Sequence, residues 1–324
     1  MLNYGELRAV QAGSRRELQF SGDTMGTSWS ARVAGIADME AQALRDHIES
    51  VFERVIAEFS PWDPNSAICQ WNHAPAGTWV PMSPEMMEVV SRSLDIHRRS
   101  DGAFHPGLGH TLAELGFGAR PVGAEPPDLN QLIVDAHRLA ELQCESGRLY
   151  QPGGLQLDLC GIAKGWAVDR TLQHLRQLGA TGAFVEIGGD ASAFGCHTNG
   201  LPWVCELETP GRKRSTLQVA LSGMSVATSG DTHRYREISG VRFAHVIDPR
   251  SLQLRDSTLR SVSVFAERCM DADAWATALL VMGVDTGLAF AREHELAAVF
   301  MCERTDGSLR LFRSPTIEKL FELE

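Results

Sequence analysis

The sequence predicts an α+β fold with mostly antiparallel sheets and flanking helices. Strand candidates come in hairpin-like pairs between helical segments, without the regular β-α-β alternation of a parallel sheet. The helical segments carry apolar residues three to four positions apart. The chain has 324 residues, 44% hydrophobic and 22% charged, which suffices for one large domain or two lobes around a substantial core.

In the first half of the chain, two helices are expected among short strands. Apolar residues from Leu44 to Phe59 recur at helical spacing and stop just before Pro61. Ser83 and Pro84 are typical of a helix start. The expected order is a strand at 18–21, a turn at Gly22-Asp23, a strand at 27–33, helices at 38–59 and 83–99, a Gly- and Pro-rich loop at 118–130, and strands at 132–134, 148–150 and 155–159.

The second half opens with a helix that ends at Gly179, a residue favoured after the last helical turn. Short apolar runs then predict several strand pairs, and two further helices precede the last strands. The expected order is a helix at 163–178, strands at 183–187, 191–194, 203–207 and 216–221, two strands flanking His245, a strand at 261–266, helices at 272–282 and 286–293, and strands at 297–302 and 309–312.

Composition argues against several classes of protein. A formal net charge of -11 disfavours nucleic-acid binding, which needs a positive surface. Seven scattered cysteines without a C-x-x-C pair disfavour a zinc ribbon and fit a reducing compartment. Residues 1–20 contain no apolar run of signal-peptide length, and no stretch reaches the roughly 18 apolar residues of a membrane span. We therefore expect a cytoplasmic protein without a membrane span.

The stretch from Asp158 to Asp169 is a candidate anion site. A strand is expected to end at Asp158, a tight turn to pass Gly161, and a helix to open near Lys164. Free N–H groups at a helix start, with a lysine beside them, suit a phosphate group. The Walker A spacing is absent. From these residues alone, Asp158 as a turn residue and Lys164 as a solvated lysine are favoured over an anion site.

Asp271, Asp273 and Thr277 form a candidate cation site. If Asp271 caps a helix, Asp273 and Thr277 lie one turn apart on the same face. A carboxylate and a hydroxyl are hard oxygen ligands, which suit Mg²⁺ better than zinc. Two such ligands are too few, so water, a backbone carbonyl or a phosphate must complete the shell. The alternative is a threonine that bonds back to its own helix.

Two further patterns carry polar groups beside predicted strands. Thr228-Ser229-Gly230 follows a strand, and His245 lies in an apolar strand, where a neutral histidine can act as a base or as a phosphate donor. A core histidine bonded to backbone is the alternative. Gly188-Gly189 permits either an ordinary hairpin turn or the close approach of a ligand to the backbone.

Together, these motifs resemble the FAD:protein FMN transferase family, the ApbE-type flavin transferases. They occur in the family's order over most of the chain. The matching pieces are Met25-Gly26-Thr27, Gly102-Ala103-Phe104, the stretch from Asp158 to Asp169, Gly188-Gly189-Asp190, Thr228-Ser229-Gly230-Asp231, His245-Val-Ile-Asp248-Pro249 and Asp273-Ala-Trp-Ala-Thr277. The resemblance implies a single two-lobed domain related to the tunnelling fold, here residues 18–324 after an N-terminal extension of 1–17.

The resemblance also implies an activity: Mg²⁺-dependent transfer of FMN from FAD to a Thr or Ser hydroxyl of an acceptor flavoprotein, with release of AMP. Lys164 and His245 would be the catalytic residues, and both would contact FAD. Gly161, through its carbonyl, would hold the metal together with Asp273 and Thr277. The remaining residues of the FAD site would be Met25, Trp62, Ala103, Phe104, His105 and Asp158.

The sequence departs from the family in two places. His105 stands where the family usually has Asp after Gly-Ala-Phe. If that carboxylate helps to bind the cofactor in the family, the affinity for the cofactor or its orientation is expected to differ here. Leu252 replaces a family glycine. Two rival functions share the same residues: a Mg²⁺-dependent FAD pyrophosphatase that gives FMN and AMP, and a non-catalytic FAD-binding protein.

Overall fold

A computed structural model gives the fold of the chain. The structure describes residues 17–36, 39–118, 137–207, 217–230, 235–238, 241–244, 248–250, 258–304, 306 and 308–321.

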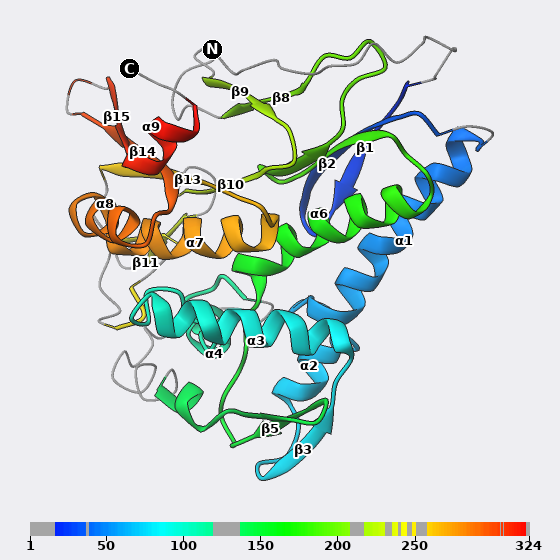
Figure 1. Cartoon of the computed structure of the whole chain (residues 1–324). Coiled ribbons are helices and arrows are strands. Elements are labelled where there is room, and N and C mark those ends of the chain that lie inside the picture. Colours follow the sequence, from blue (N-terminus) through cyan, green and yellow to red (C-terminus); the bar gives the residue numbers. More distant parts are fainter. Residues whose placement is uncertain are drawn as a thin grey trace.

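A large antiparallel sheet forms the centre of the molecule. In the described part of the chain its eight strands run in the order β1-β2-β6-β7-β10-β13-β14-β15, and each neighbouring pair is antiparallel. Figure 1 shows this sheet in the upper half. The strands are β1 Glu17–Thr24, β2 Thr27–Ala34, β6 Gly182–Ile187, β7 Asp190–Phe194, β10 Ser225–Gly230, β13 Leu259–Ala266, β14 Ala297–Glu303 and β15 Leu309–Arg313.

Helices cover one face of the sheet and enclose the main core. The apolar stripe of α1 is buried from Leu44 to Phe59, and α7 is buried over most of its surface, since it is apolar nearly all round. In Figure 1, α6 and α7 run end to end beneath the sheet, with α3 below them. The helices of this layer are α1 Ala41–Phe59, α6 Cys160–Gln177, α7 Cys269–Met282 and α8 Val284–Glu293, and α3 Pro84–Arg99 packs beneath α6 and α7.

A second, smaller core covers the opposite face of the sheet. There Trp203 and Leu221 of a two-stranded hairpin pack with Val226, Phe265 and Ile317. The covering elements are β8 Trp203–Leu207, β9 Leu217–Leu221 and the short helix α9 Pro315–Leu320.

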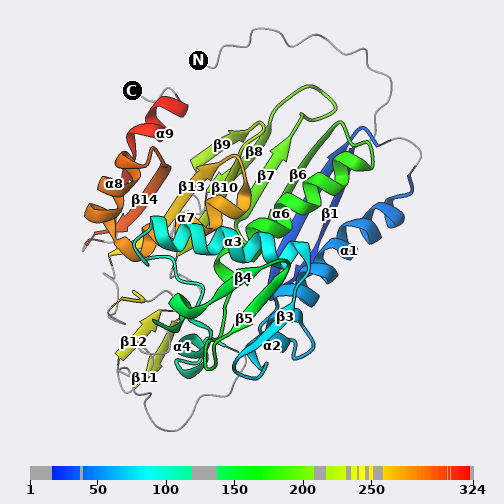
Figure 2. The same ribbon diagram turned by 60° about the horizontal axis from the view of Figure 1, so that its bottom comes forward.

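Beyond α3 lies a part of the chain with short elements only, seen at the bottom of Figure 1 and toward the viewer in Figure 2. Its three-stranded sheet has the order β3-β5-β4. The elements are α2 Ala67–Asn72, β3 Thr78–Pro81, α4 Gly109–Glu114, the 3-10 turn Arg138–Glu141, β4 Gln143–Glu145 and β5 Arg148–Gln151. A separate two-stranded sheet is formed by β11 Tyr235–Ile238 and β12 Val241–Ala244.

The expectation of an α+β fold with mostly antiparallel sheets is confirmed. Helices expected at 38–59 and 83–99 correspond to α1 and α3, and Ser83 caps α3 by accepting from the N–H of Met86 at 3.0 Å. No helix of the described residues is long and apolar enough to cross a membrane. The strand expected at 132–134, most of the loop at 118–130 and His245 lie outside the described residues.

The expected turn at Gly22-Asp23 was wrong, because β1 continues through it. Gly22 pairs with Trp29, and the hairpin turns at Met25-Gly26. Both turn residues have positive φ, 49° at Met25 and 73° at Gly26, as a tight two-residue hairpin turn requires. Gly22 looked like a turn residue, but a strand also tolerates glycine beside a large neighbour such as Trp29.

The expected strand at 155–159 is also wrong. Leu155, Leu157 and Leu159 alternate and are buried, as the pattern suggested. However, the segment pairs with no strand of the described residues. Its N–H groups bond to a side chain and a loop instead: Leu157 donates to Asn72 Oδ1 at 2.8 Å and Asp158 to the Pro106 carbonyl at 2.8 Å. The alternating leucines therefore indicate buried side chains, and burial does not require that the segment pairs in a sheet.

Two helix starts come earlier than expected. Helix α6 begins at Cys160, so Gly161 lies inside its first turn and Lys164 in its second. Helix α7 begins at Cys269, so Asp271 does not cap it. The cap comes instead from Asp169 of α6, whose carboxylate accepts from the N–H groups of Cys269 at 2.8 Å and Met270 at 3.1 Å.

Candidate functional site

Two hairpin turns meet at one end of the central sheet. The β6–β7 turn has positive φ at Gly188 (59°) and Gly189 (92°), so it is the ordinary hairpin turn that the sequence left open. The N–H of Gly188 donates to the carbonyl of Ser28 at 3.0 Å, just after the Met25-Gly26 turn. A β-carbon at Gly188 would lie 2.8 Å from Thr27, so only glycine allows this approach. The turn delivers Asp190 into the interior.

Asp190 is the partner of Lys164. The Lys164 ammonium forms an ion pair and hydrogen bond with Asp190 Oδ2. Asp190 is 0% exposed, whereas the Lys164 side chain is 30% exposed. The backbone of Thr228 on β10 also stabilises the charged form of this carboxylate by a hydrogen bond.

Asp273 lies beside this pair, on α7. Its Oδ2 accepts from the N–H of Gly165 at 3.2 Å, and the residue is 3% exposed. The two helices approach closely here, since a β-carbon at Gly165 would lie 2.4 Å from the carbonyl oxygen of Cys269. Glycine at this position therefore brings the carboxylate of Asp273 to the Lys164 turn of α6.

The three ionisable groups carry one ammonium for two buried carboxylates. Burial raises the pKa of Asp190, and the charge of Asp273 raises it further, against the opposing effect of Lys164. Burial also raises the pKa of Asp273, although Lys164 and the Gly165 N–H oppose it. Burial alone would lower the pKa of Lys164, but the charges of Asp190 and Asp273 outweigh it and raise that pKa above its ordinary value. The cluster keeps Lys164 charged, and its two carboxyl groups are harder to ionise than they would be in water.

Thr277 lies one helical turn beyond Asp273, as its spacing predicted. Its Oγ1 lies 3.0 Å from the hydroxyl of Ser229 at the end of β10. A β-carbon at Gly161 would lie 3.3 Å from this Oγ1 and 3.4 Å from Cε2 of Phe104. The structure therefore brings the start of α6, the Thr277 hydroxyl and the Phe104 ring together.

The segment around Ala103 and Phe104 reaches the site by a tight turn after α3. Ser100 accepts from the N–H groups of Ala103, through its carbonyl, and of Phe104, through its hydroxyl. Both Ala103 and Phe104 are buried. Because the N–H of Asp158 donates to the carbonyl of Pro106, this segment is tied to the residues that precede α6.

Asp158 anchors the start of α6. Its Oδ1 accepts from the N–H of Cys160 at 2.8 Å. Burial raises the pKa of Asp158, and the hydrogen bonds from Cys160 oppose that shift. In this structure Asp158 thus fixes the turn that leads to Gly161.

His105 is a neutral side chain. Burial lowers its pKa to about 3, and the neighbouring His97 and His137 lower it too. The backbone N–H of Gly107 donates a hydrogen bond to Nδ1 of His105, with 3.1 Å between the two nitrogen atoms. The proton of the neutral ring is therefore on Nε2. The His97 ring stands edge to face against it at 4.6 Å. His105 therefore offers one N–H donor where a carboxylate would offer a negative charge.

The oxygen atoms of Asp273, Thr277 and Gly161 are of the kind that a hard cation such as Mg²⁺ prefers as ligands. Asp273 offers a carboxylate, Thr277 a hydroxyl, and Gly161 a carbonyl with two lone pairs, of which the helix uses at most one for the N–H of Gly165. Within the described residues, no group of three His, Cys, Asp or Glu side chains could hold a metal ion. A cation bound here would therefore need water or substrate oxygens as well.

Residues 25–300 match the model of the ApbE family. The chain belongs to this family. The FAD:protein FMN transferase of Klebsiella pneumoniae (strain 342) is 30% identical, and the match covers 91% of this chain and 86% of that protein. The enzyme of the same name from Haemophilus influenzae is also 30% identical, over 94% and 92% of the two chains.

Solved ApbE structures have the same fold. The apo form of the Pseudomonas stutzeri flavinyl transferase ApbE matches with a TM-score of 0.86 at 31% identity, covering 97% of this chain and 100% of that one. The flavin transferase ApbE from Vibrio cholerae matches with a TM-score of 0.83 at 27% identity, covering 94% and 99%. The ApbE fold therefore extends over nearly the whole chain.

The structure brings together some of the residues that the ApbE resemblance selected: Gly161, Thr277 and Phe104 are neighbours, and Lys164 lies close to Asp273. Trp62 follows α1, and its side chain is 49% exposed. Its backbone N–H donates to Ser60 Oγ at 3.3 Å, and Trp62 makes none of the contacts described above. His245 lies outside the described residues. Sequence reasoning gave no role to Asp190 and no pairing to Ser229, although both lie in motifs that it singled out.

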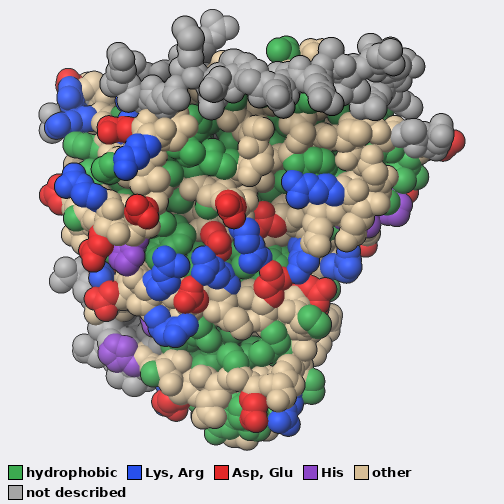
Figure 3. Space-filling view, in the orientation of Figure 1, with side chains coloured by type: hydrophobic (Ala, Val, Ile, Leu, Met, Phe, Trp, Pro, Cys, Tyr) green, Lys and Arg blue, Asp and Glu red, His purple; other side chains and the backbone are tan. Residues whose placement is uncertain are grey.

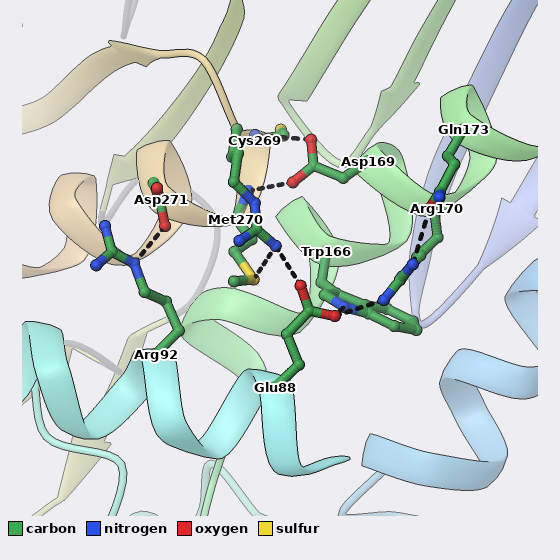
Figure 4. A network of polar contacts seen from close by, with 10 residues as sticks. Glu88, Arg92, Trp166, Asp169, Arg170, Gln173, Cys269, Met270 and Asp271 are labelled. Atoms are coloured by element: carbon green, nitrogen blue, oxygen red, sulfur yellow. Dashed lines mark hydrogen bonds and ion pairs between the residues drawn. The ribbon is translucent and has the colours of Figure 1, made fainter. Parts of the chain in front are cut away.

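The outer face of α6 carries a second ionic network, shown in Figure 4. Glu88 of α3 accepts from Trp166 Nε1 at 3.2 Å and from the guanidinium groups of Arg170 and Arg268. Nearby, Arg92 joins α3 to Asp271 of α7 at 2.7 Å. In Figure 3, positive and negative side chains intermingle in a band across the middle of this face. This network fastens α3 to α6 and α7.

Proposed function

We propose that this chain is a Mg²⁺-dependent FAD:protein FMN transferase, which moves FMN from FAD to a Thr or Ser hydroxyl of an acceptor flavoprotein and releases AMP. Membership of the ApbE family and the names of its relatives support the activity. The observation that carries the proposal is the convergence of Lys164, Asp273, Thr277 and Gly161 at the junction of α6 and α7.

Each residue has a task in this proposal. Asp273, Thr277 and the Gly161 carbonyl hold Mg²⁺, which when bound neutralises charge that develops on the diphosphate oxygens. The charged Lys164 contacts the same diphosphate, and its pairing with Asp190 fixes the position of its ammonium group. His245 takes the proton of the attacking hydroxyl. Met25, Trp62, Ala103, Phe104, His105 and Asp158 line the FAD site, together with Lys164 and His245.

The direct test is flavin transfer in a purified system. The full chain is mixed with FAD, Mg²⁺ and a candidate acceptor flavoprotein, and in-gel flavin fluorescence after denaturation reports covalent attachment, while chromatography reports AMP. We expect fluorescence and AMP in equal amounts. AMP without fluorescence would show a pyrophosphatase instead, and FAD binding without AMP would show a non-catalytic binder.

Asp273→Asn is the matched control for this assay. Asparagine keeps the size of the side chain and an oxygen for the Gly165 N–H, but it weakens cation binding. We expect turnover to fall by about 100-fold or more, while the free energy of unfolding stays the same or rises, because the buried carboxylate with its raised pKa is gone. Wild-type turnover in this variant would remove Asp273 from the metal site.

We also propose that residues 18–324 form the transferase domain and that the protein works in the cytoplasm. The seven cysteines, all within the described residues, are free thiols, which fits a reducing compartment. Cell fractionation followed by detection of the protein would test the location.

A further inference from the structure

The hydroxyl of Thr277 has an unusual partner for a helical threonine. Threonine inside a helix commonly donates to the carbonyl four residues earlier, as Thr171 does to Ala167 at 2.8 Å in α6. Thr277 instead meets the hydroxyl of Ser229, on a different element, at 3.0 Å. Its side chain is thus oriented by a strand of the central sheet rather than by its own helix.

We propose that Ser229 is a positioning residue for the cation site, because it accepts the proton of the Thr277 hydroxyl and so directs the oxygen lone pair of Thr277 to the metal. This inference rests on the proposed function. A hydroxyl oxygen that binds a cation uses a lone pair for the bond, and its proton must then go to an acceptor on another side. Ser229 Oγ is such an acceptor at hydrogen-bond distance.

The position of Ser229 on its strand supports this role. Side chains alternate between the two faces of a strand, and Ala227 belongs to the main core on the helix side, whereas Val226 belongs to the core on the opposite side. Ser229 shares the face of Ala227 and therefore points toward α7. It is partly exposed, as is Thr277, so the pair is accessible to a ligand.

The same strand provides an internal control. Thr228 points to the opposite face, where its Oγ1 lies 2.8 Å from the hydroxyl of Ser263 on β13. The two hydroxyl pairs have similar length and belong to adjacent residues, but only one includes a proposed metal ligand. Ser263→Ala therefore removes a comparable hydrogen bond without touching the proposed site.

The experiment measures cation binding directly, with Mn²⁺ as the probe. Mn²⁺ is titrated into the full chain saturated with FAD, and free Mn²⁺ is counted by electron paramagnetic resonance. We expect Ser229→Ala to raise the Mn²⁺ dissociation constant about 10- to 100-fold, Ser263→Ala to change it less than about twofold, and Ser229→Thr, which restores a hydroxyl, to recover most of the loss. FAD affinity without cation should not change.

The outcomes separate this inference from the proposal on which it rests. If Ser229→Ala is folded by circular dichroism and binds Mn²⁺ as tightly as the wild type, Ser229 has no positioning role although the cation site exists. If the wild type binds no Mn²⁺ in the presence of FAD, the cation site itself is wrong. An equal loss in Ser229→Ala and Ser263→Ala would show a general effect of the sheet and would also overturn the inference.

Discussion

Helix α6 takes part in two ionic networks that differ in depth. The inner one joins Lys164 to Asp190 near Asp273, and Asp190 is 1% exposed at its side chain. The outer one joins Arg170 and Arg268 to Glu88, whose side chain is 31% exposed. Both link α6 to other elements, but only the inner network borders the residues proposed to bind FAD and metal.

The balance of charge also differs. Burial raises the pKa of Glu88, but hydrogen bonds from Trp166 and Arg268 and the charge of Arg170 outweigh it and lower that pKa overall. In the inner network, the pKa values of Asp190 and Asp273 are raised. The outer network stabilises its carboxylate and holds helices together, whereas ionising the carboxyl groups of the inner network costs stability. Such a cost is expected where a cation or substrate completes the site.

The variant Lys164→Met gives the strongest test of this difference between the inner and outer networks. This variant leaves two buried carboxylates without a positive partner, so we expect the free energy of unfolding to fall by about 2–4 kcal/mol, less than for a fully buried pair because Lys164 is partly exposed. FAD turnover should fall with it. Urea unfolding and the transfer assay measure the two effects.

Two companion variants test whether unpaired carboxylates cause the loss of stability in Lys164→Met. Adding Asp190→Asn to Lys164→Met removes one unpaired charge, so the double variant should be more stable than Lys164→Met while remaining inactive. Arg170→Met, the matched change in the outer network, should cost less than about 1 kcal/mol. If Lys164→Met and Arg170→Met destabilise the chain equally, the inner network is no more strained than the outer one.

The difference between the networks also marks what the sequence could predict. The spacing of Asp273 and Thr277 follows from helical periodicity, and the family motifs selected Lys164 and Gly161. Asp190 and Ser229 acquire their roles through contacts 26 and 48 residues away in the chain. Spacing within a motif cannot reveal such pairs, because the sheet order that brings them together is a property of the whole fold.

The fold was predictable where one face of an element is buried. The amphipathic helix at 38–59 was found from its apolar stripe, since α1 buries that stripe in the main core. The pattern at 155–159 was equally regular, yet its leucines are buried by loops and helices rather than by strand pairing. The start of α7 was missed because its cap comes from Asp169, which lies 100 residues from Cys269 in the chain. The start of α6 was missed because Asp158, one residue before the N-cap position, accepts from the N–H of Cys160.

A smaller effect is expected from His105, which makes the stability of the folded chain depend on pH in the acid range. Its pKa is about 3 in the folded chain and 6.5 ordinarily, so between these values the unfolded chain binds a proton that the folded chain does not. Stability is therefore lost as the pH falls from about 6.5 toward 3. At about pH 5 the loss relative to pH 7 should be up to about 2 kcal/mol.

His105→Gln isolates this contribution. Glutamine can accept the N–H of Gly107 but does not titrate, so the variant should lose less stability between about pH 7 and 5 than the wild type. Urea unfolding at both pH values gives the difference, in which all other titrating groups cancel. Identical pH dependence in the two proteins would mean that His105 becomes protonated without cost and is not held neutral by the fold.

The smallest effect is expected from Glu88→Gln in the outer network. Glutamine retains one acceptor oxygen but removes the charge between the two arginines, so stability should fall by about 1 kcal/mol or less. Most of that loss should disappear at about 0.5 M NaCl, which screens partly exposed charges. FAD turnover should stay within about twofold of the wild type, because the partners of Glu88 in the described part of the chain, Trp166, Arg170 and Arg268, are not proposed site residues.

The turnover of Glu88→Gln is the more decisive of the two measurements. Glu88 fastens α3 to α6, and α3 leads directly into the turn that carries Ala103 and Phe104. If the outer network only joins helices, loosening it leaves that turn in place, because the turn is held by Ser100 and His97. A tenfold or greater loss of turnover with little loss of stability would show that the outer network positions the FAD site, and the division between a fastening network and a functional one would no longer hold.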